Sequence, residues 1–166
     1  MIYIIDANNL AGKIGILKEK NFDQILIDNV CSYFLNKKNE IYLVFDSIDP
    51  FGDRYKKNNI IIVYAPKNEL FNNADDKIID LFYQKILNKK LKDEISLITD
   101  DREIIQKTKK ISKNYNKKTN FISATNFAKI FINNDDNDFD NFDDRGISLK
   151  NQKNINQELL DIWKEK

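Results

Sequence analysis

Histidine is absent from this chain of 166 residues. Imidazole is the commonest general acid–base group in enzymes and the commonest transition-metal ligand. Its absence excludes a Ser-His-Asp hydrolase and the cleavage of RNA by a pair of histidines. Any catalysis by this chain must therefore use carboxylates, lysine, tyrosine or a metal-bound water.

Cysteine and long apolar stretches are also scarce. The single cysteine, Cys31, lies in the apolar run Ile25–Leu35, so an intrachain disulfide is excluded and we interpret this thiol as a small core residue. No apolar stretch approaches the roughly 18 residues that a membrane-spanning helix requires. The N-terminus enters an apolar run at once, without the pattern of a signal peptide. We expect a cytoplasmic protein.

Charges of the two signs nearly balance, with a net charge of +1, but they are unevenly distributed. Basic residues outnumber acidic ones over residues 1–134, and the reverse holds over residues 135–166. If several acids of the first part bind cations, the remaining surface there is basic and suits a polyanion. The aspartate-rich segment Asp135–Asp144 is typical of a solvated linker, with a metal or partner site as the alternative.

Short apolar runs alternate with stretches of helical spacing. The runs predict strands at Ile2–Ile5, Ile41–Phe45, Ile60–Tyr64, Ile95–Ile98 and Thr119–Ile122. The helical spacing predicts helices at Phe22–Leu35, Asn73–Leu91, Asp101–Ile111, Thr125–Ile132 and Asn156–Lys166. We expect a loop after the first strand, around Asn8, Asn9 and Gly12, and a polar loop over Ser47–Asn59.

This alternation predicts an α/β fold with a central, mainly parallel sheet of about five strands and helices on both faces. We expect one folded domain over residues 1–134, followed by an acidic linker and a C-terminal helix over residues 135–166.

Three predicted strands run straight into aspartate, at Asp6, at Asp46 and at Asp100–Asp101. A further pair, Asp75–Asp76, opens a predicted helix that Asn73 is placed to cap. In an open parallel sheet, the carboxyl ends of the strands around the topological switch point share one crevice. Carboxylates gathered there repel one another unless a cation joins them, and oxygen ligands suit Mg²⁺ or Mn²⁺. The sequence therefore predicts a divalent-metal site.

Each of these acids also has a plausible structural role on its own. Asp75 and Asp76 fit the first turn of a helix, where the macrodipole favours negative charge. Asp46 could hold a polar turn, and Asp100 with Glu103 could form a variant of the capping box. The joint occurrence of these acids, in this order and after an acid at the end of the first strand, favours a shared function.

The ordered motifs resemble those of the PIN-like nucleases, specifically the NYN/YacP branch of endoribonucleases. The matching segments are Asp6-Ala7-Asn8-Asn9 for D-x-x-N, Val44-Phe45-Asp46 for the second strand end, Asn73-Ala74-Asp75-Asp76 for a T-A-D-E-like helix start, and Thr99-Asp100-Asp101 for T-S-D or T-N-D. The resemblance covers about residues 1–132. The departures are Asn73 in place of Thr, Asp76 in place of Glu, and Asp100 in place of Ser or Asn.

The resemblance implies a three-layer, PIN-like (Rossmannoid) fold and metal-dependent hydrolysis of single-stranded RNA. Water would attack phosphorus and leave a 5′-phosphate and a 3′-hydroxyl, and the RNA could be messenger RNA presented by a ribosome. The implied catalytic residues are Asp6, Asn9, Asp75, Asp76 and Asp101. The implied ligands of Mg²⁺ or Mn²⁺ are Asp6, Asp75 and Asp101, with Asp46 and Asp100 as further candidates.

Several basic residues are candidates for contacts with RNA phosphates. They are Arg54, Lys56 and Lys57 in the predicted polar loop, and Lys77 and Arg102 beside the acids. For each of them the alternative is an ordinary solvated surface charge. Tyr55 could stack on a base or anchor the loop.

Three other functions are weighed against the nuclease. A receiver-like, Mg²⁺-binding phosphoacceptor domain would have adjacent acids after the first strand, where this chain has Asp6 followed by Ala7. A non-catalytic RNA- or ribosome-binding module on the same fold would not need the full set of acids. A DNA-directed flap-type nuclease would need additional helical elements to hold a duplex.

Overall fold

The computed structural model describes residues 1–88 and 94–135, with side chains up to Lys129. The chain divides into two units, Met1–Lys129 and Ile130–Lys166, and the account below concerns the first. Two predictions after Asp135 lie outside the described residues, namely the rest of the acidic segment and the helix Asn156–Lys166. The end of the helix predicted to reach Leu91 also lies outside them.

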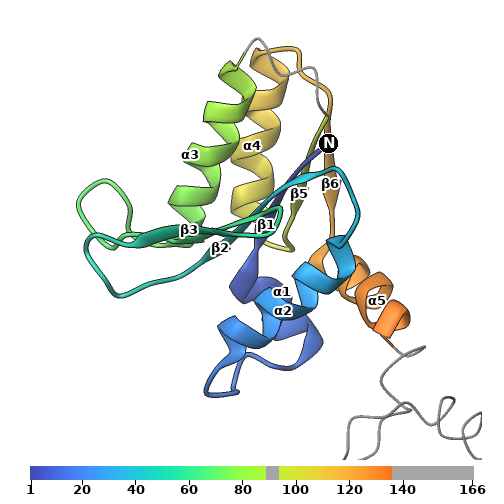
Figure 1. The fold of residues 1–166 in the computed structure, drawn as a ribbon. Helices are drawn as coiled ribbons and strands as arrows, with labels where there is room; N and C mark the ends of the chain where they lie inside the picture. Colours follow the sequence, from blue (N-terminus) through green and yellow to red (C-terminus); the bar gives the residue numbers. More distant parts are fainter. Residues whose placement is uncertain (89–93, 136–166) are drawn as a thin grey trace, which may run out of the picture. The chain divides into compact units, whose positions relative to one another are not determined.

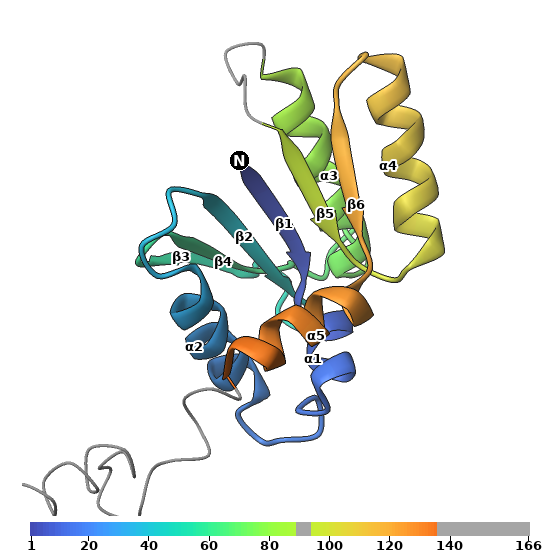
Figure 2. The ribbon, with the colours of Figure 1, turned by 90° about the vertical axis from the view of Figure 1, so that its right-hand side faces the viewer.

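Six strands form one sheet within the described residues (Figures 1 and 2). They are β1 (Ile2–Asp6), β2 (Glu40–Phe45), β3 (Asp53–Lys57), β4 (Ile60–Tyr64), β5 (Ile95–Ile98) and β6 (Thr119–Ile122). Their order across the sheet is β3-β4-β2-β1-β5-β6. All neighbouring pairs are parallel except β3 with β4. The predicted α/β fold with a mainly parallel sheet is confirmed.

Helices cover both faces of this sheet and give three layers. The helices are α1 (Ala7–Ile14), α2 (Phe22–Phe34), α3 (Ala74–Leu87), α4 (Arg102–Asn114) and α5 (Ala124–Asp135). Figures 1 and 2 show α3 and α4 on one face, and α1, α2 and the start of α5 on the other. In the part of the chain that the structure describes, no helix combines the length and the apolar character needed to span a membrane.

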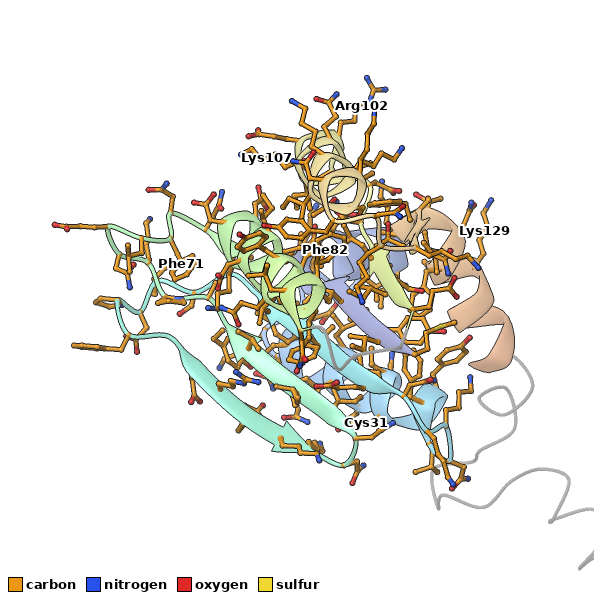
Figure 3. The ribbon with its side chains drawn as sticks, turned by 90° about the horizontal axis from the view of Figure 1, so that it is seen from above. Cys31, Phe71, Phe82, Arg102, Lys107 and Lys129 are labelled. Atoms are coloured by element: carbon orange, nitrogen blue, oxygen red, sulfur yellow. The ribbon has the colours of Figure 1, made fainter. Side chains whose placement is uncertain are left out.

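Alternation along β1 decides which side chains meet which layer. Ile2 and Ile4 are fully buried in a core shared with Phe82 of α3, which Figure 3 labels where α3 lies over the sheet. Tyr3 faces the opposite layer, where its ring lies 5.0 Å from that of Phe34 in α2. Because successive strand residues point to opposite faces, Asp6 falls on the same side as Ile4, towards α3.

Strand β3 was not predicted, and the expectation of a loop throughout Ser47–Asn59 is wrong. Four of the five residues of β3 are exposed and none is aliphatic, so the strand carries no alternation of apolar and polar residues. It pairs with β4 alone, at the edge of the sheet. Charged residues are characteristic of edge strands, because they discourage pairing with another chain. Pairing with the apolar strand β4 makes this segment extended.

Helix α1 was also missed, in a segment expected to be a loop. The carboxylate of Asp6 accepts a hydrogen bond from the backbone N–H of Asn9 and so caps the helix. Leu10 and Ala11 are buried on its inner side, and Gly15 ends the helix with a φ of 86°. A capping aspartate and a terminating glycine were both visible in the sequence. The strand passes into the helix without a linker, which hid the boundary.

Candidate functional site

The topological switch point lies between β1 and β5. From β1 the chain adds β2 and β4 on one side, whereas β5 and β6 lie on the other. In sheets of this type, ligands bind outside the carboxyl ends of the strands at the point where the order reverses. Asp6 ends β1, and Thr99 to Asp101 follow β5 directly. Two of the four motifs therefore lie on adjacent strands at the switch point.

Asp6 is the most deeply buried acid at this edge. It is 6 % exposed, and both carboxylate oxygens accept hydrogen bonds. Oδ1 accepts from the backbone N–H of Asn9 at 3.0 Å, and Oδ2 accepts from the hydroxyl of Thr99 at 2.8 Å. Burial raises the pKa of Asp6 to about 6, despite these bonds, and the charges of Asp75 and Asp46 add to the increase.

Asp75 lies half-buried in the first turn of α3. Burial raises its pKa, and so do the nearby charges of Asp101, Asp46 and Asp76. One of its oxygens accepts a long hydrogen bond of 3.4 Å from the side chain of Asn73. The negative charge of one carboxylate makes ionisation of its neighbours more costly. The acids at the ends of β1 and β2 and at the starts of α3 and α4 therefore lie close enough to affect one another's pKa.

Asp46 and Asp101 each bind the N-terminus of a helix. Asp46 accepts a hydrogen bond of 2.8 Å from the backbone N–H of Ala74, the first residue of α3. Asp101 is the N-cap of α4 and accepts from the N–H groups of Glu103 and Ile104, at 2.7 and 3.0 Å. Both carboxylates therefore have a structural role, and each uses only one of its two oxygens for it.

Two structural alternatives drawn from the sequence are wrong. The turn suggested for Asp46 does not use its side chain, because this carboxylate reaches across to α3. The capping box suggested for Asp100 with Glu103 does not form, because Asp101 supplies the cap of α4. The start of α3 is as predicted, since the side chain of Asn73 accepts a hydrogen bond from the N–H of Asp76 at 3.2 Å.

Asp76 and Asp100 turn towards other partners. The carboxylate of Asp76 accepts two hydrogen bonds from Asn72, at 3.0 and 3.2 Å, and so holds the loop before α3. Asp100 accepts a bond of 2.7 Å from the hydroxyl of Thr125 and lies 3.3 Å from the ammonium group of Lys13. Burial alone would raise the pKa of Asp100, but these bonds outweigh it and lower the pKa to about 2.

Asn9 contacts both turns at this edge, one through its backbone and one through its side chain. Its backbone N–H donates to Asp6, and its Oδ1 accepts a hydrogen bond of 3.3 Å from the backbone N–H of Asp100. Asn9 thus connects the turn after β1 with the turn after β5. Its side chain forms no hydrogen bond with Asp6 in the described residues, so the orienting role predicted for Asn9 stays a prediction.

The remaining aspartates at this edge form no ion pair within residues 1–88 and 94–129. They are Asp6, Asp46, Asp75, Asp76 and Asp101. Lys107 of α4 nevertheless lines a small cavity at Asp75 and Asp76, and its pKa is raised by its bond to Glu103 and further by the charges of these two acids. Elsewhere in the same part of the chain, exposed and half-exposed acids do pair with lysine, as Glu40 does with Lys85. The switch point therefore gathers more acidic than basic side chains, and only Asp100 among its aspartates forms an ion pair in the described residues.

The donor set suits a hard cation, although it does not enclose one. In the described part of the chain, no three His, Cys, Asp or Glu side chains converge closely enough to hold a metal ion by themselves. Mg²⁺, however, usually keeps several waters and needs only one or two carboxylates. Asp46, Asp75 and Asp101 each retain a carboxylate oxygen with no hydrogen bond to the described residues. These residues fit a hydrated Mg²⁺ or Mn²⁺ ion.

The basic candidates of β3 are divided between the two faces of the sheet. Arg54 pairs in register with Val63, and Val63 belongs to the core under α3. Lys56 has the same orientation and is exposed. Lys57 points the other way, where its ammonium group lies 2.5 Å from the carboxylate of Asp28 in α2.

Tyr55 shares the face of Lys57. Its ring stacks on that of Tyr64 at a centroid distance of 6.4 Å, and the hydroxyl of Tyr64 donates to Asp23 of α2. This contact favours the anchoring role of Tyr55 over base stacking.

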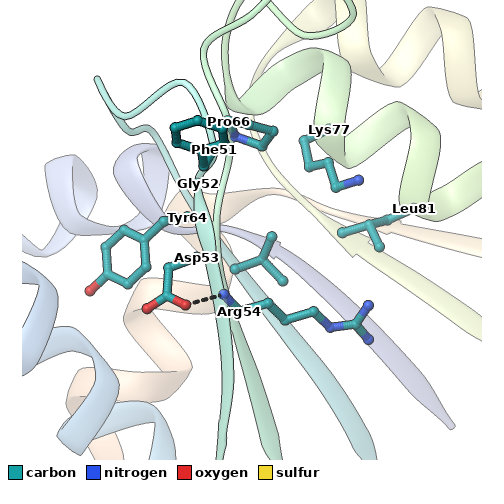
Figure 4. A pocket seen from close by; sticks show the side chains of 9 residues that line it. Phe51, Gly52, Asp53, Arg54, Tyr64, Pro66, Lys77 and Leu81 are labelled. Atoms are coloured by element: carbon teal, nitrogen blue, oxygen red, sulfur yellow. Dashed lines mark hydrogen bonds between the residues drawn. The ribbon is translucent and has the colours of Figure 1, made fainter.

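Arg54 and Lys77 line one pocket of about 330 Å³ between β3, β4 and α3 (Figure 4). Arg102 is the first residue of α4, and Figure 3 shows it pointing outwards. The structure thus brings two of the five basic candidates together and leaves Lys56, Lys57 and Arg102 apart from them.

Some residues that shape this edge were not singled out as site residues from the sequence. Thr99 was quoted only as part of a motif, yet its hydroxyl contacts Asp6. Glu103 lines a small cavity of about 70 Å³ together with Asp75 and Asp76, and its charge contributes to the raised pKa of Asp75. The motif was a signal for Thr99, whereas nothing local in the sequence pointed to the contact of Lys13 with Asp100.

Comparison with family models, with curated proteins and with solved structures gives no significant match for this chain. What is established is an α/β fold with a six-stranded, mostly parallel sheet in its described part, and a group of aspartates at the switch point of which only Asp100 forms an ion pair there.

Proposed function

We propose that this protein is a metal-dependent endoribonuclease of the PIN-like kind, from the NYN/YacP branch, which hydrolyses single-stranded RNA. The observation that carries the proposal is the set of acids at the switch point. Asp6, Asp75 and Asp101 come from three distant motifs, and none of them forms an ion pair in the described residues. Besides burial, the charge of Asp75 raises the pKa of Asp6, and the charge of Asp101 raises the pKa of Asp75. A divalent cation supplies the positive charge that such a site lacks, and it can then bind the negatively charged phosphate diester.

The strand order supports the same proposal. The parallel strands follow the order β4-β2-β1-β5-β6, which corresponds to the Rossmann order with the first strand at the centre. Receiver domains have the flavodoxin-like order, in which the first strand is flanked by the second and third strands. Here β1 lies between β2 and β5, so a receiver-like phosphoacceptor is disfavoured.

The residues at the site have separate roles in the proposed reaction. Asp6 provides a buried, fixed charge, which the backbone N–H of Asn9 and the hydroxyl of Thr99 hold in orientation. Asp75 and Asp101 present free carboxylate oxygens from the starts of two helices. Together these three would hold Mg²⁺ or Mn²⁺, directly or through water. When bound, such an ion activates water and neutralises charge on the phosphate.

The absence of histidine fits hydrolysis by water better than attack by the RNA itself. Attack of the 2′-hydroxyl on the adjacent phosphorus usually relies on a general base such as imidazole, and this chain has no histidine. In the proposed reaction, a water oxygen bonds to phosphorus, the bond from phosphorus to the 3′ oxygen breaks, and a proton passes to that oxygen. The products are a 5′-phosphate and a 3′-hydroxyl.

A non-catalytic RNA- or ribosome-binding module is the second candidate. Asp6, Asp46 and Asp101 all bind backbone N–H groups at helix starts, which gives each of them a reason to be present without catalysis. In the described residues, no three of these acids converge closely enough to hold a metal ion by themselves. This candidate predicts RNA binding that is indifferent to Mg²⁺ and Mn²⁺.

The test is cleavage of a labelled, unstructured RNA with Mn²⁺ or Mg²⁺, followed by end analysis. The variant Asp6→Asn/Asp101→Asn removes two charges but keeps an amide oxygen at both caps, since asparagine caps helices as well as aspartate does. Asp28→Asn, on the exposed side of α2, is the matched control for loss of one carboxylate. A parallel arm offers messenger RNA on translating ribosomes.

We expect cleavage that EDTA abolishes, that the double variant loses, and that Asp28→Asn retains. Equal cleavage by the double variant would remove the case for this site. Products ending in a 2′,3′-cyclic phosphate would contradict attack by water. Metal-independent binding without cleavage, on free RNA and on ribosomes alike, would support the binding module instead.

A further inference from the structure

The pocket lined by Arg54 and Lys77 has a composition that the roles above do not explain. It measures about 330 Å³ and lies between the hairpin of β3 with β4 and helix α3. Val63, Pro66 and Leu81 provide apolar surface, and Arg54 and Lys77 provide two cations (Figure 4). This volume is at the small end of the range for sites that bind small molecules, about 300–1,000 Å³.

The two cations are held in place and face the pocket. The guanidinium group of Arg54 lies 5.7 Å from the centre of the Tyr42 ring and forms no ion pair within the described residues. The ammonium group of Lys77 lies 3.0 Å from Asp80 and 4.4 Å from the centre of the Phe71 ring. Aromatic contacts of this kind restrict a long side chain while leaving hydrogen-bond donors free.

One acidic residue also lines the pocket, but it is turned away from the cations. The carboxylate of Asp53 accepts a hydrogen bond of 2.7 Å from the backbone N–H of Arg54. Figure 4 shows this carboxylate on the side of Tyr64, whereas the guanidinium group of Arg54 extends towards Leu81. The cations at the α3 side of the pocket are therefore Arg54, which has no ion pair in the described residues, and Lys77, whose ammonium group is already paired with Asp80.

The rim carries an aromatic ring with nothing covering it. Phe51 lines the pocket and is 90 % exposed. Its neighbour Gly52 has a φ of 65°, and a Cβ atom there would lie only 2.5 Å from the carbonyl oxygen of Tyr64. Glycine thus lets the loop press closely against the end of β4, with Phe51 at the mouth of the pocket. The exposed ring of Phe51 is therefore accessible to a ligand in the pocket.

The pocket and the acidic edge share two segments of the chain. Lys77 follows Asp75 by two residues in α3, and the loop that carries Phe51 begins at Asp46. A ligand that reaches both would place one phosphate at the metal ion proposed for the acids and a second phosphate at Arg54 and Lys77. It would also place a flat ring at Phe51. Single-stranded RNA has this repeat of phosphates and bases, and aromatic rings and arginine are its usual partners.

We infer that this pocket is a nucleotide subsite for an RNA residue that flanks the cleaved bond, with its base on Phe51 and its phosphate on Arg54 and Lys77. The inference rests on the proposed nuclease function and adds the place where the protein binds the RNA chain next to the cleaved bond. It assigns Phe51, a residue to which the motifs give no role, to substrate binding, and it leaves Tyr55 as an anchor.

The experiment measures binding without cleavage. Fluorescent single-stranded RNA hexamers of A, C and U are titrated with the full chain in EDTA, at several salt concentrations, by anisotropy. The variants are Phe51→Ala, Arg54→Gln and Lys77→Gln. Lys113→Gln in α4 and Leu35→Ala, both exposed and away from the pocket, are the matched controls for loss of a charge and of an apolar side chain. Far-UV circular dichroism and urea unfolding verify that every variant is folded.

We expect Phe51→Ala to weaken binding about tenfold, with little change in salt dependence, because stacking is not ionic. Arg54→Gln and Lys77→Gln should weaken binding and also flatten the salt dependence by about 0.7 in log–log slope for each lost contact with a single-stranded phosphate. The inference is overturned if the pocket variants bind as tightly as wild type, if the two controls lose as much, or if no hexamer binds.

The same proteins are then assayed for cleavage with Mn²⁺, which separates this inference from the nuclease proposal. Loss of hexamer affinity in the pocket variants without any metal-dependent cleavage by wild type would support an RNA site here and reject the nuclease. Metal-dependent cleavage that all three pocket variants retain at wild-type rate and substrate affinity would support the nuclease and reject this subsite.

Discussion

The hydroxyl of Thr99 donates a hydrogen bond of 2.8 Å to the buried carboxylate of Asp6. The same oxygen accepts a hydrogen bond of 3.0 Å from the backbone N–H of Asp101. One side chain at the end of β5 therefore connects the two acids that the first and last motifs contribute. Thr99 is 1 % exposed, so water does not replace these contacts easily.

Thr99→Val should lower the free energy of unfolding at pH 7.5 by about 1–3 kcal/mol, because it leaves buried polar groups unsatisfied in a side chain of nearly the same shape. The bond from Thr99 lowers the pKa of Asp6, so its loss should raise that pKa further. Urea unfolding and NMR titration of the Asp6 carboxyl group measure both effects. Thr99→Ser keeps the hydroxyl and serves as the control, and a Val variant as stable as the Ser variant would contradict the contact.

Asp6→Asn should stabilise the metal-free protein at neutral pH and lose this advantage in acid. The pKa of Asp6 is about 6 in the folded protein and 3.8 as a reference. A raised pKa of a carboxyl group means that ionisation costs folding free energy above pH 6, and that this cost disappears as the pH falls towards 4. The shift corresponds to at most about 3 kcal/mol. Urea unfolding in EDTA at pH 4 and at pH 7.5 tests this, and an equal effect at both values would count against it.

Mn²⁺ or Mg²⁺ should stabilise the wild-type protein against unfolding. A ligand at 100 times its Kd raises the free energy of unfolding by about 2.7 kcal/mol if it binds only the folded state. Asp75→Asn removes a carboxylate with a free oxygen, so it should reduce this gain, whereas Asp28→Asn should retain it. Thermal unfolding across a metal titration gives the result. Identical metal effects in wild type and Asp75→Asn would exclude Asp75 as a ligand.

Asp101 allows its capping role to be separated from its charge. Asp101→Asn should keep most of the stability of α4, whereas Asp101→Ala should cost about 1 kcal/mol, as losses of an N-cap typically do. Both variants lack the carboxylate, so both should lose metal binding equally. Comparing urea unfolding with a metal titration by calorimetry makes the distinction. A metal affinity that follows the cap and not the charge would assign Asp101 a purely structural role.

Gly52→Ala should destabilise the protein, because alanine there has a strained positive φ and its Cβ meets the Tyr64 carbonyl oxygen at 2.5 Å and the Pro66 nitrogen at 2.8 Å. We expect a loss of about 1–3 kcal/mol. Gly12→Ala is the matched opposite case. Gly12 lies inside α1 with its nearest contact at 3.8 Å, so alanine should add about 0.5–1 kcal/mol. Urea unfolding of the two variants should show effects of opposite sign.

Much of the fold was predictable because burial on both faces leaves a plain pattern. Four of the five parallel strands, β1, β2, β4 and β5, are mainly apolar and buried, whereas β6 is half polar and only partly buried. The helices α2, α3 and α4 show apolar residues at helical spacing. The predicted helix boundaries differ from the observed ones by only a few residues where they are described. The motif order likewise identified Asp6, Asp75 and Asp101, since acids at strand ends and helix starts are visible without any knowledge of the pairing.

Other features depended on contacts between distant segments. Strand β3 is extended because β4 offers it an unpaired edge, and its charged sequence carries no sign of this. Alternation along β3 places Arg54 in the pocket and turns Lys57 towards Asp28. Two basic residues of the same short strand therefore have different surroundings, which their sequence context does not reveal.

The sequence by itself determined the layers, the parallel strands and the set of acids, because local burial and chain order suffice for those. Only the tertiary structure decided that Asp100 is neutralised by Lys13, that Asp46 and Asp101 bind helix starts, and that Phe51 stands exposed beside a pocket. These facts depend on which side chains meet across the sheet edge. That meeting is fixed by strand order and register, which no short stretch of sequence encodes.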